Sequence, residues 1–200
     1  MFRTALALLF AAAPVLVHAQ ANWEKKREKT GIVVEIRDAP GHDLKESRST
    51  VQFVADLEKV IDVIFDYSRY AEWAPRHVEA REVARPAENV IVSYTISDSP
   101  WPVTDRDIVV RNTVTRRADG SVRIDMKAIE GMVPERDDLV RMTLFEGHYL
   151  LEPKPGGQVK VTYQALLDPA GSIPGWMVNL AVVDTPYDVL FNLRRQVTGG

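Results

Sequence analysis

Few side chains in this sequence are able to hold a metal ion or move a proton. The chain has four histidines and no cysteine, and His42, His77 and His148 are the histidines that follow its apolar amino-terminal stretch. They form no pair at the short spacing with which helices and hairpins supply zinc ligands. We therefore expect neither a metal site nor a cofactor.

One pair of residues has the composition of a general acid and base. Glu146 and His148 are two residues apart in a predicted strand and share a strand face with Met142 and Leu144. If both faced the interior, they could pass a proton between them. Gly147 favours a bend that turns one of them outward, or a position of the pair at a wet rim. We predict no catalytic residue, and this pair is the basis of an enzymatic alternative.

The other polar residues in notable positions fit structural roles. Arg106 and Asp107 open a predicted strand, where each can pair with a neighbouring charge as a clamp. Ser172 precedes a predicted helix and Asp184 lies beside a predicted helix break, and both residue types favour helix caps. Ser172 also lacks the flanking glycine spacing of a nucleophile elbow.

The composition is that of a globular chain with its own core. Of 200 residues, 46% are hydrophobic, and the formal net charge is -3 at pH 7. This length favours one domain. Lysines and arginines are scattered along the chain, so we expect no broad positive surface that would hold a phosphate backbone. Nucleic acid is excluded as a partner, and a monomer is expected.

The amino terminus has the pattern of a secretory signal peptide. Arg3 is followed by an apolar stretch over residues 5–17, and then by compact residues that suit a signal peptidase. We predict a signal peptide over residues 1–19, cleaved after Ala19 or Ala21, and one domain over residues 20–200; an uncleaved anchor is the alternative. No later stretch approaches the ~20 apolar residues of a membrane-spanning helix. A cysteine-free, exported chain indicates the bacterial periplasm.

A short helix, two strands and a longer helix are predicted to follow. Residues 21–29 are mostly charged, and we expect a leading helix there that docks through Trp23. Apolar and polar residues alternate over residues 32–36 and 51–55, the period of a half-buried strand. Asp56 is placed to cap a helix over residues 57–65, whose apolar residues fall three and four apart.

From residue 90 to residue 168 the sequence is a succession of strands and turns. Asp119-Gly120 forms a tight hairpin turn, and Pro153-Lys154-Pro155-Gly156-Gly157 joins strands predicted over residues 139–151 and 159–167. Successive hairpins predict an antiparallel sheet. The polar loop 130–138 presents Met132 and Val133, as expected of a mobile flap over an apolar opening.

A long amphipathic run with Pro186 in its middle closes the chain. Because proline removes a backbone donor and collides with the preceding helical turn, we predict two helices, over residues 174–183 and 186–197, that meet at a kink. Thr185 is placed to cap the second helix. A hairpin-rich sheet closed by one kinked helix defines an α+β fold.

Three short motifs keep a fixed order in the second half of the chain. Trp101-Pro102 precedes Arg106-Asp107 at a strand start, Met132-Val133-Pro134-Glu135 precedes a strand, and Gly171-Ser172-Ile173-Pro174 leads into a helix that ends in Leu193-Arg194. Together they resemble the START (steroidogenic acute regulatory protein-related lipid transfer) family of the helix-grip superfamily, over most of residues 51–197. The resemblance implies a curved antiparallel sheet wrapped around the long carboxy-terminal helix, with a lipid tunnel between them.

Together with the strand and helix periods, the resemblance predicts a set of ligand-binding residues. They are Tyr94, Arg106, Ile108, Val110, Asn112, Met126, Met132, Met142, Leu144, Tyr163, Met177, Leu180, Val183 and Tyr187. Sterol-binding members of the family carry an acid and an arginine on neighbouring strands of the tunnel. Here those strands offer Tyr94 and Asn112, which suit a ligand with a small neutral polar end.

Three functions are open on this fold, because a fold does not by itself fix function. The favoured one is an exported protein that binds or transfers a lipid and touches a membrane surface transiently. The second is a cyclase, aromatase or isomerase that acts on an apolar substrate. The third is a partner-binding module whose core is filled by its own side chains.

Overall fold

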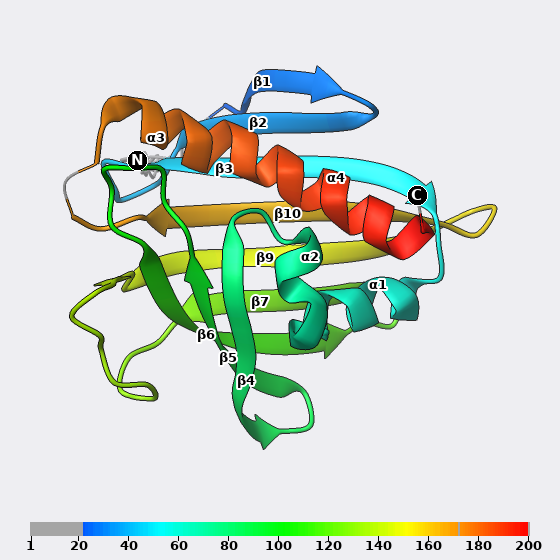
Figure 1. Cartoon of the computed structure of the whole chain (residues 1–200). Helices are drawn as coiled ribbons and strands as arrows, with labels where there is room; N and C mark the ends of the chain where they lie inside the picture. The colour runs from blue at the N-terminus through cyan, green and yellow to red at the C-terminus, as the bar shows by residue number, and fades with distance from the viewer. Residues whose placement is uncertain (1–21, 172, 200) are drawn as a thin grey trace, which may run out of the picture.

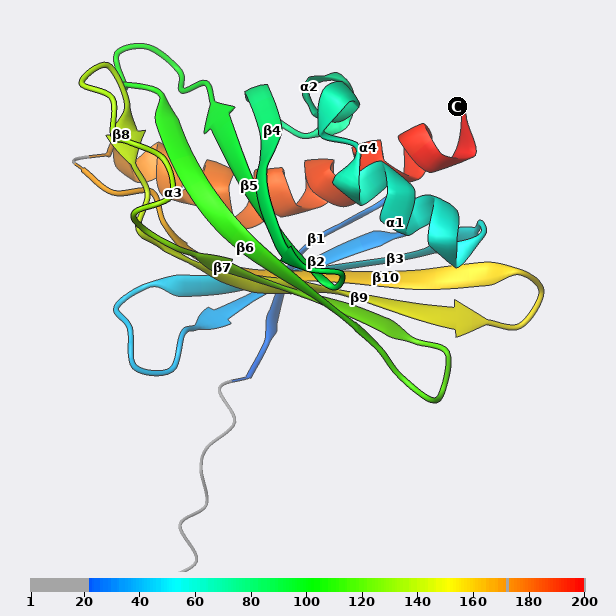
Figure 2. The ribbon, with the colours of Figure 1, turned by 90° about the horizontal axis from the view of Figure 1, so that it is seen from below.

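A strongly curved sheet forms the body of the protein and holds the helices on its concave side (Figures 1 and 2). The computed structural model describes residues 22–171 and 173–199. The predicted signal peptide and the predicted cap at Ser172 lie outside the described residues. Along the chain the elements are β1 (Glu24–Lys29), β2 (Ile32–Asp38), β3 (Lys45–Val54), α1 (Leu57–Phe65), the 3₁₀ turn η1 (Tyr67–Arg69), α2 (Tyr70–Trp73), β4 (His77–Ala87), β5 (Val90–Ser97), β6 (Arg106–Arg116), β7 (Val122–Ala128), β8 (Val140–Arg141), β9 (Leu144–Lys154), β10 (Gln158–Asp168), α3 (Gly175–Asn179), the π-helical segment η2 (Leu180–Asp184) and α4 (Thr185–Thr198).

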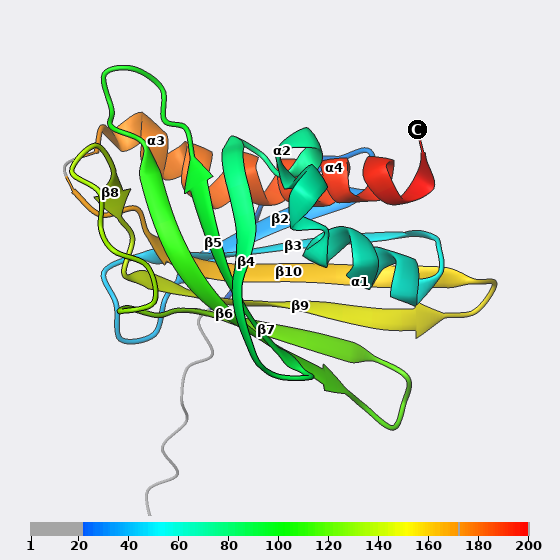
Figure 3. The same cartoon turned by 60° about the horizontal axis from the view of Figure 1, so that its bottom comes forward.

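The strands follow the order β1-β2-β3-β10-β9-β7-β6-β5-β4 across the sheet, and β8 pairs with β6. The neighbours in this order are antiparallel, whereas β8 runs parallel to β6. Helix α4 crosses the concave face, with α1 packed against it and α2 between α4 and β4 (Figure 3). The predicted α+β helix-grip architecture is confirmed.

Two apolar clusters cover the two faces of the sheet. The larger lies between the concave face and the helices, with Ile32, Val34, Val60, Ile124, Leu151, Leu190 and Leu193 fully buried in it. The smaller lies on the opposite face of β5 and β6, where Val92, Tyr94, Ile96 and Val109 pack under Ile129, Val133 and Leu139 of the following loop. Strand β5 is therefore buried on both faces.

Helix α1 forms as the sequence predicts. The Asp56 side chain accepts a hydrogen bond from the backbone nitrogen of Glu58 at 2.7 Å, which satisfies one of the free donors of the first turn. Val60, Ile61 and Ile64 are buried on one face of the helix. Within the described ranges, no helix is both long and apolar enough to cross a bilayer.

The prediction of a leading helix over residues 21–29 is wrong, because β1 lies there. As a helix, this segment would have only Trp23 to bury. As a strand it adds an edge to β2, and the indole contacts two guanidinium groups, with the Cζ atoms of Arg37 and Arg48 at 4.5 and 4.3 Å from the ring centroid. These contacts anchor Trp23 to the sheet.

The strand predicted over residues 139–151 is also interrupted. Val140 and Arg141 form β8 beside β6, and β9 begins only at Leu144. The interruption lets the Arg141 side chain turn to Asp107, with Nε–Oδ1 and Nη2–Oδ2 distances of 2.8 Å. A buried charge needs such a partner, so this pairing decides the path of the chain.

The predicted helix break at Pro186 is replaced by the π-helical segment η2. The Thr185 amide donates to the Leu180 carbonyl oxygen, an i to i−5 bond that widens the turn preceding the proline ring and relieves its collision with the helix. Thr185 itself is helical and Asp184 makes no side-chain cap bond, so the predicted cap is wrong.

Gly147 supports a first prediction, because the backbone of β10 leaves no room for a side chain there. A Cβ atom there would collide with the Gln164 carbonyl oxygen and lie 3.2 Å from the Cα of Ala165, both in the paired backbone. We expect Gly147→Ala to lower the free energy of unfolding by about 1–3 kcal/mol in denaturant titrations. At Gly175, the first residue of α3, a Cβ meets nothing within 4 Å, so Gly175→Ala is the control and should cost no stability. Equal stability of the two variants would contradict the close approach.

Candidate functional site

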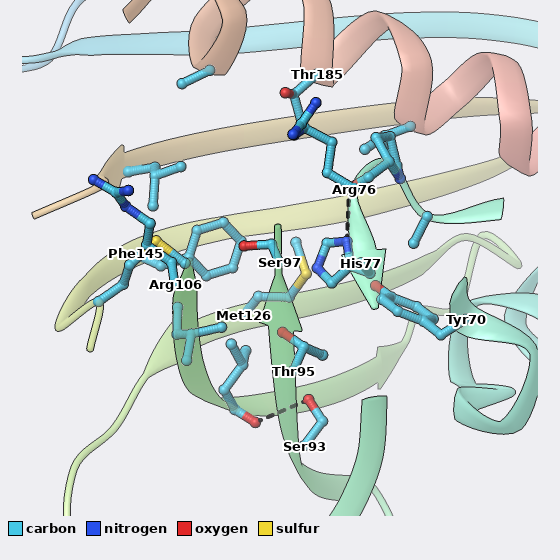
Figure 4. Close-up of a pocket in the computed structure, with 18 of the residues that line it drawn as sticks. Tyr70, Arg76, His77, Ser93, Thr95, Ser97, Arg106, Met126, Phe145 and Thr185 are labelled. Atoms are coloured by element: carbon cyan, nitrogen blue, oxygen red, sulfur yellow. Dashed lines mark hydrogen bonds between the residues drawn. The ribbon is translucent and has the colours of Figure 1, made fainter. Parts of the chain in front are cut away.

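A cavity lies between the concave face of the sheet and the helices (Figure 4). Its volume is about 200 Å³, several times the roughly 30 Å³ that one water molecule takes up in the liquid. Side chains of α1, α2, β4, β5, β6, β7, β9 and β10 form its wall, and η2 with the start of α4 forms its roof. The third hypothesis requires an interior that is completely filled by side chains, and the cavity shows that it is not.

Eight of the fourteen predicted ligand-binding residues lie on the cavity wall: Arg106, Ile108, Val110, Asn112, Met126, Met142, Tyr163 and Leu180. The strand residues among them lie on the face that the period of two predicts. That they contact a ligand stays a prediction.

Five predicted residues lie off the wall, namely Tyr94, Met132, Leu144, Val183 and Tyr187, and the side chain of Met177 lies outside the described residues. The Tyr94 hydroxyl donates to Asp107 Oδ2 at 2.9 Å on the opposite face of the sheet. Met132 is 44% exposed in the loop, and Phe145 faces the cavity where Leu144 was expected.

The π-helical segment explains the two misplaced helix residues. An α-helix presents residues three and four apart on one face. On this basis Val183 and Tyr187 were predicted to face the cavity together with Leu180. Here the wider turn brings Thr185, five residues after Leu180, to the cavity. Tyr187 is buried in the apolar core away from the cavity wall, and its hydroxyl lies 3.0 Å from the Thr30 hydroxyl.

Several wall residues were not predicted. They include Tyr70, Trp73, His77, Ser93, Thr95, Ser97, Tyr149 and Thr185. On β5 only Tyr94 was assigned to the cavity, but it packs with the apolar residues of that strand under the loop 129–139, and the hydroxyl residues face the cavity. The apolar side chains Ile129, Val133 and Leu139 in that loop were the available signal that this face is covered.

The pair formed by Asn112 of β6 and Ser93 of β5 on the cavity wall is uncharged. Asn112 Nδ2 donates to the Ser93 hydroxyl oxygen at 3.1 Å and to the Ile91 carbonyl oxygen at 3.2 Å. Ser93, rather than the expected Tyr94, is the partner from β5. The expected neutral character of this position is retained, with an amide and a hydroxyl in place of an arginine and an acid.

Arg106 and Asp107 act as two separate clamps. The Arg106 guanidinium donates to the carbonyl oxygens of Thr104, Pro169 and Ala170 and to the Ser99 hydroxyl, which ties the loop before β6 to the segment after β10. Asp107 binds Arg141 instead. Because charged hydrogen bonds to the carboxylate outweigh its burial, the pKa of Asp107 lies below its ordinary value.

His77 lies on the wall between Tyr70 and Ser97 (Figure 4). Its Nδ1 lies 2.9 Å from the Pro75 carbonyl oxygen, which can only accept, so Nδ1 carries the proton and Nε2 is an acceptor. Its ring meets that of Tyr70 edge to face, with the centroids 5.2 Å apart. Burial lowers the pKa of His77 below 6.5, so the imidazole is neutral at pH 7.

Burial also keeps the tyrosines of the wall protonated. It raises the pKa of Tyr67 to about 12, and it raises the pKa of Tyr70, Tyr149 and Tyr163 above the ordinary value as well. These phenols therefore act as neutral hydroxyl groups rather than as bases.

The proposed acid and base pair does not face the cavity. On β9 the cavity side carries Phe145 and Tyr149. Glu146 is exposed and pairs with Lys127 at 2.6 Å, and His148 follows it on the same outer side. In the part of the chain that the structure describes, no cluster of acids and histidines is arranged to hold a metal ion.

The fold is a helix-grip domain with an internal cavity, and comparison with known proteins identifies its family. The START domain model matches residues 16–197. An uncharacterized protein of Pseudomonas aeruginosa is 31% identical over 173 residues, which are 86% of this chain and 85% of that protein. The chain belongs to the START domain family.

Solved structures agree with this assignment. A STAR-related lipid transfer protein fragment from Xanthomonas axonopodis superposes with a TM-score of 0.81 at 31% identity, over 88% of this chain and 98% of that one. Human StAR-related lipid transfer protein 5 superposes with a TM-score of 0.82 at 20% identity, over 91% of this chain and 89% of that one. The second similarity shows the shared fold.

His77 supports a prediction about pH. Because its pKa is lower in the folded protein than the 6.5 of the free side chain, the unfolded chain binds more protons between the two values, and stability falls as the pH drops below about 6.5. NMR titration should give a His77 pKa below 6.5, and His77→Gln should flatten the loss of stability between pH 7 and 5. An unchanged slope in His77→Gln would contradict this account.

Proposed function

We propose that this protein is an exported lipid-binding or lipid-transfer protein that holds a lipid or sterol-like molecule between the sheet and the carboxy-terminal helix. The observation that carries the proposal is the cavity. Its wall combines apolar side chains with a few uncharged polar groups, the usual composition of small-molecule sites, on the scaffold of a family named for lipid transfer.

Burial of apolar surface would supply the binding energy. At about 25 cal/mol per Å², a ligand that hides several hundred Å² gains several kcal/mol before ordering costs. The cavity of about 200 Å³ is smaller than the ~300–1,000 Å³ of typical ligand pockets, so a large lipid requires the roof to move.

The roof is held from outside by β1. Arg27 Nη1 lies 3.0 Å from Asp184 Oδ1, and its guanidinium carbon lies 3.8 Å from the centroid of the Tyr187 ring. Both contacts fall on η2 and the first turn of α4. Because Arg27 and Asp184 are 29% and 48% exposed, water reaches their ion pair, and we propose that η2 opens by releasing it.

Export and the contact with membranes are parts of the same proposal. The amino-terminal pattern over residues 1–19 supports secretion into a bacterial periplasm, where the protein would act as a monomer. Trp101 is 92% exposed in the loop before β6, and Val178 of α3 is 42% exposed. Tryptophan favours the boundary between lipid and water, so we propose that Trp101 contacts the membrane surface.

Filling the cavity tests the binding function. Ala181 lies on the wall, so Ala181→Phe should reduce binding of a fluorescent fatty-chain probe by about tenfold or more, and should reduce the lipid extracted from the purified protein and detected by mass spectrometry. Asn179→Phe adds the same ring at an exposed position and should bind normally. A wild-type protein that carries no lipid and binds no probe would overturn the proposal.

Trp101 can be tested separately from the cavity. Trp101→Ala should weaken association with anionic phospholipid vesicles by about tenfold, the loss expected when one large apolar side chain no longer leaves water, while binding of the probe in solution stays unchanged. Val54 is 64% exposed at the end of β3, and Val54→Ala is the control. Equal vesicle binding by all three proteins would argue against Trp101 as the contact.

A further inference from the structure

Four polar side chains face the cavity from β4 and β5, namely His77, Ser93, Thr95 and Ser97. Ser93 is already paired with Asn112, and we name the other three, His77, Ser97 and Thr95, the polar row. His77 and Ser97 are cross-strand partners in register, and Thr95 lies two residues before Ser97, on the same face of β5. All three belong to the cavity wall. Figure 4 shows them side by side.

The polar row offers hydrogen-bonding groups that the protein leaves unused. His77 is bonded through Nδ1 to Pro75, which leaves Nε2. Among the described residues, Nε2 and the Ser97 and Thr95 hydroxyls have no protein partner, and none of the three is sealed inside the packed core. They remain accessible to a molecule in the cavity.

A purely apolar ligand would fit this wall poorly. If it displaced the water, each of these polar groups would lose its hydrogen bonds, and an unpaired buried group weakens binding. The ligand should therefore carry a polar group that pairs with the polar row.

The charges of the wall argue against an anionic group. Arg76 is paired with Asp98, with an Nη2–Oδ2 distance of 2.9 Å. Arg106 is engaged by four oxygen acceptors of the protein. A carboxylate at the polar row would also face the lone pair of His77 Nε2, because Nδ1 holds the proton. No strong attraction for an anion remains there.

Resting on the proposed function, we infer that the polar row binds the hydroxyl group of a neutral lipid alcohol. His77 Nε2 can only accept a hydrogen bond, whereas the Ser97 and Thr95 hydroxyls can also donate. A single alcohol group satisfies both sides, since it donates to Nε2 and accepts from a hydroxyl. An ether or an ester accepts but cannot donate to His77.

Three probes of equal chain length test this inference on the delipidated protein at pH 7.5: 1-decanol, decyl methyl ether and decanoate. Binding is measured by displacement of the fluorescent probe. We expect 1-decanol to bind about tenfold more tightly than the ether, the size expected for one additional hydrogen bond, and decanoate to bind no better than the ether.

Variants connect this preference to the polar row. His77→Phe keeps an aromatic ring against Tyr70 but removes the acceptor, so it should bring the affinity for 1-decanol to that for the ether while the ether still binds. Ser97→Ala should weaken 1-decanol alone by several-fold. His148→Phe, on the outer side of β9, is the matched control and should keep the preference.

The outcomes separate the two proposals. If neither 1-decanol nor the ether binds, the proposed function itself fails. If both bind equally to the wild type, if decanoate binds most tightly, or if a folded His77→Phe keeps the preference, only the alcohol site is overturned. Should His77→Phe not fold, the ¹⁵N shift of His77 Nε2 in the wild type decides, since 1-decanol must change it and the ether must not.

Discussion

The ion pair between Asp107 and Arg141 is the interaction on which the arrangement of the cavity depends. Both side chains are almost fully buried and meet through two hydrogen bonds of 2.8 Å, and removal of one partner from such a pair typically costs ~3–5 kcal/mol. Arg141 also donates to the carbonyl oxygens of Val133 and Pro134. The pair therefore fixes the loop 129–139 over the apolar face of β5. With that face covered, the hydroxyl face of β5 is directed at the cavity.

The carboxy-terminal helix shows how one proline shapes the roof of the cavity. Pro186 would end an ordinary helix, yet η2 carries the chain past it without a break. The extra residue in this turn changes which side chains face the sheet, so that Thr185 reaches the cavity and Tyr187 packs instead against Thr30 and Arg27. The same segment carries Asp184, the partner of Arg27. The unbroken helix and the ion pair with β1 therefore both depend on the π-helical segment η2.

Most of the fold was predictable because it depends on local patterns. Alternating apolar and polar residues predicted strands, Asp56 predicted the start of α1, and glycines and prolines predicted the hairpin turns. The site was only partly predictable, since a period of two separates the faces of a strand but does not say which face is interior. For β6 the apolar face was correctly predicted to line the cavity. Strand β5 is buried on both faces, and its hydroxyl face is the one that lines the cavity. His77 gave no signal of its own, because its place depends on pairing with Ser97.

The two edge strands of the sheet, β1 and β4, are protected against pairing with other strands. All six residues of β1 are charged, and β4 is interrupted by irregular pairing and contains Pro86. Such margins resist the addition of a foreign strand. The sheet can therefore stay open, rather than close into a barrel, without inviting polymerisation. An open sheet can change its curvature by small rotations between strands, so the space between the sheet and the helices can change its width without exposing a strand edge to other molecules.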